Sequence, residues 1–227
     1  MTNDNIILNN VDRKLGKEIY TSLKEAITKY PRLNNTICLV SDIDYLVTYL
    51  NNNYEECTCS YGNDDKTIMT TASMWLPKKD KNLNYYDSIL YYKPDFIGIG
   101  VNKLVKYKNA IKALKSDYAN EWCYSRNIKD AVYHEVGHIF SKIFKLTSNP
   151  KMLEFLEGNL KNNKTLSTYS KINYEELIAE CFSKYSYNPS YSELVYIIGR
   201  IIENYYLKFE DTELFDISNK KLIKNNL

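Results

Sequence analysis

Apolar residues recur at helical spacing through most of the second half of the chain. One stripe consists of Leu194, Val195, Ile198, Ile201, Ile202 and Tyr205, and another of Val132, Val136, Ile139 or Phe140, and Ile143. Each stripe covers one face of a helix, so we expect both helices to pack against a core on that side. The pattern predicts helices over residues 103–119, 128–145, 150–162, 173–186 and 190–209.

The first half of the chain mixes helical and strand-like patterns. A helix is predicted over residues 14–29, ending before Pro31, and a second over roughly 43–52. Short apolar runs predict strands at residues 36–42, 67–76, 88–93 and 96–102. The order of these elements predicts an α+β fold in which a small mixed sheet comes first and helices follow.

The strand candidate FIGIGVN, residues 96–102, has an unusual second face. Ile97, Ile99 and Val101 alternate with Gly98 and Gly100. Because glycine has no side chain, this face allows another part of the backbone to come close.

Composition is that of an ordinary folded protein. Of the 227 residues, 26% are charged and 44% hydrophobic, which is too apolar for a disordered chain. The net charge of +2 gives no electrostatic reason to expect nucleic acid as a partner, and no apolar run is long enough to span a membrane. Without repeats or linkers, we expect one domain over 1–227, with an α/β lobe (1–127), a helical lobe (128–209) and a polar tail (210–227).

The five cysteines do not follow zinc-finger spacing. Cys57 and Cys59 form a C-x-C pair in a polar stretch, and we interpret them as free thiols in preference to a structural metal site. The N-terminus MTNDNIILNNVDRK does not resemble a signal peptide. If the chain is complete, a cytoplasmic location is expected; if a leader was removed, the protein is secreted.

The two histidines of the chain, His134 and His138, lie four residues apart within AVYHEVGHIFSKIF. On a helix this spacing places both imidazoles on one face, where they can bind the same cation. Glu135 is offset by about 100° and can reach a water molecule there as a general base, the arrangement of H-E-x-x-H zinc sites. Such motifs also occur by chance, but random placement would put two histidines four apart roughly once in 100 cases. Gly137 is expected to leave space beside the metal for a substrate or a sheet.

A catalytic zinc site needs a third protein ligand, which must here be a carboxylate or a cysteine. The best candidates are Glu176 and Glu180, four apart on the predicted helix within YSKINYEELIAECF. One can bind zinc while the other accepts the free N–H of a ligating histidine. An exposed acidic helix face is the alternative, but apolar neighbours indicate burial, and a buried carboxylate needs a partner. Glu175 is expected to face solvent.

HEVGH followed by Y-x-x-x-N-x-x-E-x-x-A-E-x-F resembles the zinc metallopeptidase family that includes the anthrax lethal factor catalytic domain and the clostridial Pro-Pro endopeptidases. Tyr169, Asn173, Glu176, Ala179, Glu180 and Phe182 all fall in register with the second motif. The resemblance covers roughly residues 96–186. It implies a zincin-like fold in which the helix 128–145 carries the active site.

The same resemblance implies a role for each residue of the two motifs. His134, His138 and Glu176 would bind one Zn²⁺ per chain, with Glu135 as general base. Glu180 would support a ligating histidine, and the Tyr169 phenol would stabilise the oxyanion.

The function implied is zinc-dependent hydrolysis of peptide bonds, with a peptide or protein as substrate. In zincins of this kind the substrate lies along an edge strand beside the active helix. The candidate for that edge is FIGIGVN, with the backbone of Ile97, Gly98, Ile99, Gly100 and Val101 pairing the peptide; an interior strand is the alternative. One alternative is a zincin-fold binding or structural protein in which zinc serves only stability, because similar sequences occur in phage structural proteins. A second is a helical binding protein without a metal, in which the histidine motif is a coincidence. Cleavage preference, oligomeric state and the role of residues 1–95 have no signal in the sequence.

Overall fold

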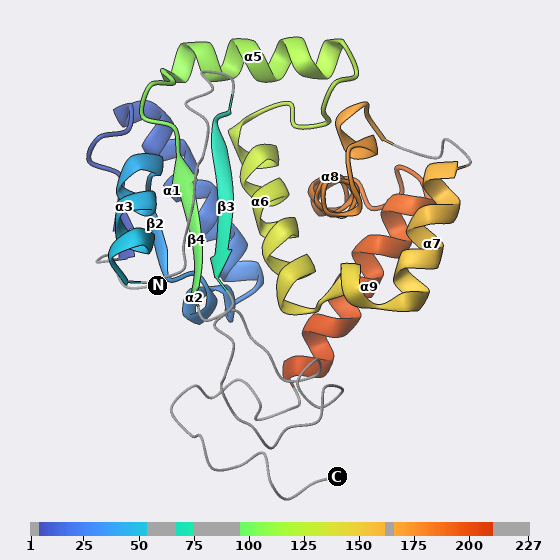
Figure 1. The fold of residues 1–227 in the computed structure, drawn as a ribbon. Coiled ribbons are helices and arrows are strands. Elements are labelled where there is room, and N and C mark those ends of the chain that lie inside the picture. Colours follow the sequence, from blue (N-terminus) through green and yellow to red (C-terminus); the bar gives the residue numbers. More distant parts are fainter. Residues whose placement is uncertain (1–4, 54–66, 75–95, 162–165, 211–227) are drawn as a thin grey trace, which may run out of the picture.

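The structure is a computed structural model that describes residues 5–53, 67–74, 96–161 and 166–210. It has an α+β fold with a small mixed sheet and mostly helices elsewhere (Figure 1). The strands are β1 (Ile6–Ile7), β2 (Leu39–Asp42), β3 (Met69–Met74) and β4 (Phe96–Val101). The α-helices are α1 (Arg13–Lys29), α2 (Leu33–Thr36), α3 (Ile43–Asn53), α5 (Tyr107–Ala119), α6 (Ile128–Ile143), α7 (Pro150–Lys161), α8 (Tyr174–Tyr187) and α9 (Glu193–Glu210). Two single-turn 3-10 helices are η2 (Leu146–Ser148) and η3 (Tyr169–Lys171).

The predicted helices are confirmed, with ends that differ by a few residues. Helix α1 begins where Asp12 Oδ1 accepts hydrogen bonds from the amides of Lys14 (3.0 Å) and Leu15 (3.1 Å). It ends at Lys29, and its C-cap Tyr30 precedes Pro31, as the pattern predicts. The strand predicted at 88–93, the pair Cys57 and Cys59, and the tail beyond residue 210 lie outside the described residues.

The sheet has the strand order β1-β2-β4-β3. β1 and β2 pair in parallel, β2 and β4 also pair in parallel, and β3 pairs antiparallel with β4. β3 is therefore an edge strand of the described sheet, and Figure 1 shows it running beside α6.

The prediction that FIGIGVN forms the substrate-binding edge is wrong. Ile99 of β4 is in register with Val40 of β2 on one side and with Thr71 of β3 on the other. The backbone of Ile97, Gly98, Ile99, Gly100 and Val101 thus has a strand on each side and cannot pair with a peptide as well. Among the described strands, the edge strand beside α6 is β3.

The glycines of β4 do allow close approach, and the element that approaches is α3. A Cβ atom built on Gly98 would lie 2.7 Å from Leu46 Cδ1, and one on Gly100 would lie 3.0 Å from Ile43 Cγ1. All six residues of β4 are buried. Helix α3 therefore packs directly on the backbone of β4, the strand that pairs with β3.

Helix α6 lies between the sheet edge at β3 on one side and α8 on the other (Figure 1). Its buried face includes Val132, Val136, Ile139 and Phe140. The Phe140 ring lies 5.1 Å from Tyr30 and 5.2 Å from Phe182 on α8, measured between ring centroids. Burial of each such side chain contributes about 1.5–3 kcal/mol, so this core holds α6 against both α1 and α8. Within the described ranges, every helix is too short or too polar to span a lipid bilayer.

Candidate metal centre

Two helices that pack closely carry the candidate ligands. His134 and His138 lie on α6, and Glu176 lies in the first turn of α8, where Asn173 Oδ1 accepts a hydrogen bond from its amide at 2.9 Å. The helices meet at Gly137, where an added Cβ would lie 2.8 Å from Ala179 Cα. The expectation that Gly137 leaves space for a substrate or sheet is wrong, because α8 occupies that space. Because Gly137 has no side chain, α6 and α8 can pack closely, which brings His134 and His138 near Glu176.

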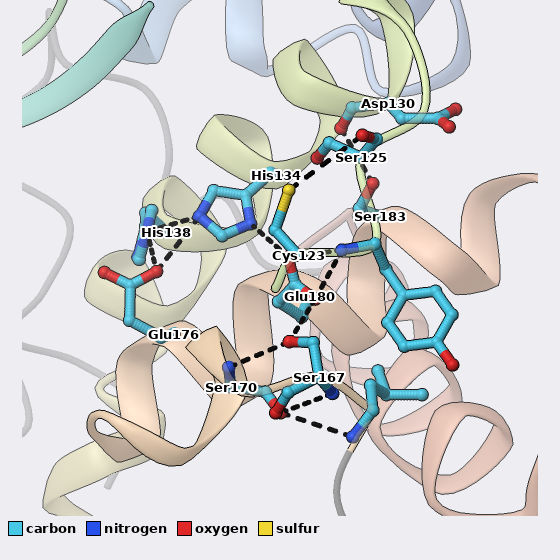
Figure 2. Close-up of polar contacts among 12 residues, drawn as sticks. Cys123, Ser125, Asp130, His134, His138, Ser167, Ser170, Glu176, Glu180 and Ser183 are labelled. Carbon is cyan, nitrogen blue, oxygen red and sulfur yellow. Dashed lines mark hydrogen bonds and ion pairs between the residues drawn. The ribbon is translucent and has the colours of Figure 1, made fainter. Parts of the chain in front are cut away.

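His134, His138 and Glu176 converge on one point. The two Nε2 atoms lie 3.1 Å apart, and Glu176 Oε2 lies 3.1 Å from His134 Nε2 and 3.3 Å from His138 Nε2. Figure 2 shows both rings turned toward the same carboxylate. Among the described residues, these three form the group of His, Cys, Asp or Glu side chains close enough to hold a metal ion together.

The triangle of donor atoms fits zinc. At Zn–N and Zn–O distances of about 2.0–2.1 Å, tetrahedral ligands lie about 3.3 Å from one another, close to the separations here. Two imidazoles and a carboxylate also form a donor set that suits zinc. Glu176 Oε2 is buried and forms no well-aligned hydrogen bond within the described part of the chain, and its partners in the metal-free protein are the two imidazoles at ion-pair distance.

The charges at the centre favour binding of a cation. Burial opposes ionisation of Glu176, but the facing histidines outweigh it and hold the pKa of the carboxyl below its usual range. Burial likewise disfavours the charged form of His134, yet the carboxylates of Glu176, Glu135 and Glu180 raise the pKa of its imidazole to about 9 in the metal-free protein. A metal must therefore displace a proton from His134.

Glu180 stands behind His134, on the side away from Glu176 (Figure 2). It is buried, and its Oε2 accepts hydrogen bonds from Ser167 Oγ at 2.8 Å and from the Tyr124 amide at 3.0 Å. Oε1 lies 3.7 Å from His134 Nδ1, within ion-pair range but long for a hydrogen bond. Burial, the largest influence, raises the pKa of Glu180. Of the two alternatives, Glu176 thus faces the shared point and Glu180 faces the outer nitrogen of His134.

Glu135 lies beside the triad and contacts the edge strand. Its side chain is buried, with 7% exposed, and its Oε2 accepts a hydrogen bond of 2.7 Å from the Thr71 hydroxyl of β3. Sequence reasoning missed Thr71, because a threonine within a strand carries no signal of such a contact.

Tyr169 approaches the triad from η3. Its ring centroid lies 5.9 Å from that of His134, and burial followed by the negative charges of Glu176 and Glu135 raises the pKa of its phenol. Its amide donates to the Trp122 carbonyl at 2.8 Å, and the two rings lie 6.1 Å apart. A protonated phenol at this position can donate a hydrogen bond near the triad. Trp122 was also missed, because no periodicity links residue 122 to residue 169.

The site opens onto a cleft of about 440 Å³. The cleft is lined by β3, by the start of α3, and by site residues that include His134, Glu135, His138, Tyr169 and Glu176. Glu175 is half-buried and lines the cleft, so it faces solvent in part. A hollow of about 650 Å³ between α7 and the start of α9 is larger, but it contains none of the predicted site residues.

Comparison with known proteins gives no match: no protein-family model, no curated protein and no solved structure is significantly similar to the chain. The resemblance to the lethal factor and Pro-Pro endopeptidase family therefore stays a prediction based on the two motifs. Cys38, Cys123 and Cys181 are free thiols, and none belongs to the triad.

Proposed function

We propose that this protein is a zinc-dependent metalloendopeptidase with a zincin-like fold. The observation that carries the proposal is the triangle of His134 Nε2, His138 Nε2 and Glu176 Oε2, with sides of 3.1–3.3 Å, beside a glutamate and a phenol in an open cleft. Two imidazoles and one carboxylate are the ligands of a known class of catalytic zinc sites.

Each residue around the triad has a chemical role in peptide hydrolysis. A bound Zn²⁺ polarises the scissile carbonyl and lowers the pKa of water at the site. Glu135, next to the ligands and within the cleft, accepts a proton from the attacking water and passes it to the departing amine. Tyr169 donates a hydrogen bond to the oxygen on which negative charge develops.

The substrate is proposed to be an extended peptide that pairs with β3. This strand is bonded to β4 on one side, and Met69, Thr70 and Thr71 line the cleft. An edge strand presents backbone N–H and C=O groups to which a peptide can add. The peptide would then pass over Glu135 and the zinc ligands.

The alternative, a binding or structural protein with a purely structural zinc, fits less well. Structural zinc sites usually have four protein ligands and are closed, whereas catalytic sites have three and keep one position open. The described residues provide three, and all three line the cleft.

The test is hydrolysis of a peptide library by the zinc-loaded protein and by Glu135→Gln. The wild type should cleave, and the variant should keep one zinc per chain and lose cleavage. Glu157→Gln, an exposed residue of α7 whose partner is Lys161, provides a control for loss of a carboxylate and should cleave normally. A wild type that binds zinc and cleaves no peptide favours the structural alternative.

A further inference from the structure

The edge strand and the proposed general base are joined by one hydrogen bond. Thr71 is the third residue of β3, and its hydroxyl lies 2.7 Å from Glu135 Oε2 and 3.4 Å from the Glu135 carbonyl oxygen. The shorter contact has the length of a strong hydrogen bond to a carboxylate. The hydroxyl is the donor, because carboxylate oxygens accept. It joins residues 64 positions apart in the chain.

The Thr71 hydroxyl has a firm support. Thr71 is in register with Ile99 of β4, the strand on which α3 packs directly. Threonine is also branched at Cβ, which restricts rotation about χ1. The donor is therefore held in place by the sheet, while Glu135 belongs to α6. The bond joins the Glu135 carboxylate of α6 to the Thr71 side-chain hydroxyl of β3.

The two oxygens of Glu135 consequently differ. Oε2 is occupied by Thr71, and no hydrogen bond to Oε1 is found within the described residues. A glutamate side chain that rotated freely would present either oxygen in many directions. With Oε2 bonded to Thr71, the carboxylate rotates less freely, and Oε1 is the oxygen that stays without a protein partner among the described residues.

We propose that Thr71 is a positioning residue for Glu135: its hydroxyl holds Oε2 so that Oε1 faces the reacting water. This inference rests on the proposed peptidase function. It also links substrate binding to the base, because the strand that carries Thr71 is the one proposed to pair with the peptide.

The experiment compares Thr71→Val with Thr71→Ser in the full-length, zinc-loaded protein. Valine keeps the shape and the branched Cβ but removes the donor, whereas serine keeps the hydroxyl. Because small errors in the position of a catalytic group slow chemistry strongly, Thr71→Val should lower kcat about ten- to hundredfold, with KM and zinc content within twofold of wild type. Thr71→Ser should restore most of kcat. Thr28→Val, which removes an exposed hydroxyl of α1 that donates to the Lys24 carbonyl at 2.8 Å and lies outside the cleft lining, should match wild type.

A second measurement tests the hydrogen bond between Thr71 and Glu135 without an activity assay. The melting temperatures of Thr71→Val, Glu135→Ala and the double variant are compared, all without metal. If the hydroxyl and the carboxylate are bonded in solution, the loss in the double variant should be smaller than the sum of the single losses. If wild type cleaves nothing while the losses are non-additive, the peptidase proposal fails and the bond stands. Additive losses, or a Thr71→Val enzyme with kcat within twofold of wild type, would overturn the inference.

Discussion

Gly137→Ala is a small change that should separate the two halves of the metal site. The added Cβ would lie 2.8 Å from Ala179 Cα, 3.2 Å from the Ala179 carbonyl oxygen and 3.3 Å from Phe182 Cβ. Since two of these contacts are backbone atoms of α8, a side-chain rotation cannot relieve them. The helices α6 and α8 must move apart.

The distances set the size of the effect. Carbon atoms attract one another at about 3.5 Å or more, so the shortest contact has to lengthen by about 0.7 Å. Metal sites tolerate ligand displacements of only about 0.2 Å. Gly137 precedes His138, and Ala179 lies three residues after Glu176, so the movement occurs where the ligands meet.

Zinc affinity should therefore fall by about 10- to 100-fold, the range seen when the surroundings of ligands are disturbed. The free energy of unfolding should change less. Overpacking costs about 1–3 kcal/mol, while alanine within a helix is about 1 kcal/mol better than glycine. A large loss of affinity with a net destabilisation of only about 0–2 kcal/mol is the expected signature.

The assay is competition for zinc against a chromophoric chelator, together with urea unfolding of the metal-free protein. Gly158→Ala is the matched control, because among the described residues no heavy atom outside its own helix backbone lies within 4 Å of a Cβ built there, and the residue belongs to α7. It should leave affinity unchanged and stabilise the fold by about 0.5–1 kcal/mol. A Gly137→Ala protein that binds zinc within threefold of wild type would refute the argument that this contact sets the ligand geometry.

Three further predictions concern the residues around the triad. Tyr169→Phe should lower kcat about 100-fold, the size of a lost oxyanion donor, with little change in KM; steady-state kinetics checks this, and a change in KM alone would make Tyr169 a binding residue. Zinc affinity should rise with pH between 6 and 8, because the pKa of His134 is about 9 without metal and its proton must leave; a flat profile in chelator competition would contradict this. The metal-free protein should lose stability as pH rises from 6.5 to above 9. Protonated His134 forms its ion pair with the carboxylates fully below pH 6.5, its pKa in the unfolded chain, and loses it as pH passes its folded pKa of about 9. His134→Ala should make the melting temperature nearly independent of pH over this range.

Much of the helical part could be predicted because its causes are local. The apolar spacing of α6 and α8 lies within single helices, and Asn127 and Asn173 cap their first turns. Since helical residues four apart share a face, the pairs His134/His138 and Glu176/Glu180 could be read directly from the sequence. Only the position of α6 relative to α8 could not be predicted from the sequence.

The sheet was harder because strand order depends on residues far apart in the chain. FIGIGVN is buried on both faces, and nothing within it distinguishes an interior strand from an edge strand. Its position follows from pairing with β2 and β3. For the same reason the role of Gly137 was misjudged: the sequence shows that a side chain is missing there, but not which element fills the space.

The central claim is that His134, His138 and Glu176 bind one metal ion together. Zinc content after loading and gel filtration, measured by elemental analysis on wild type and Glu176→Ala, tests it most directly. We expect one zinc per wild-type chain and much less than one in the variant. A wild type without zinc, or a variant that retains a full equivalent, would contradict it.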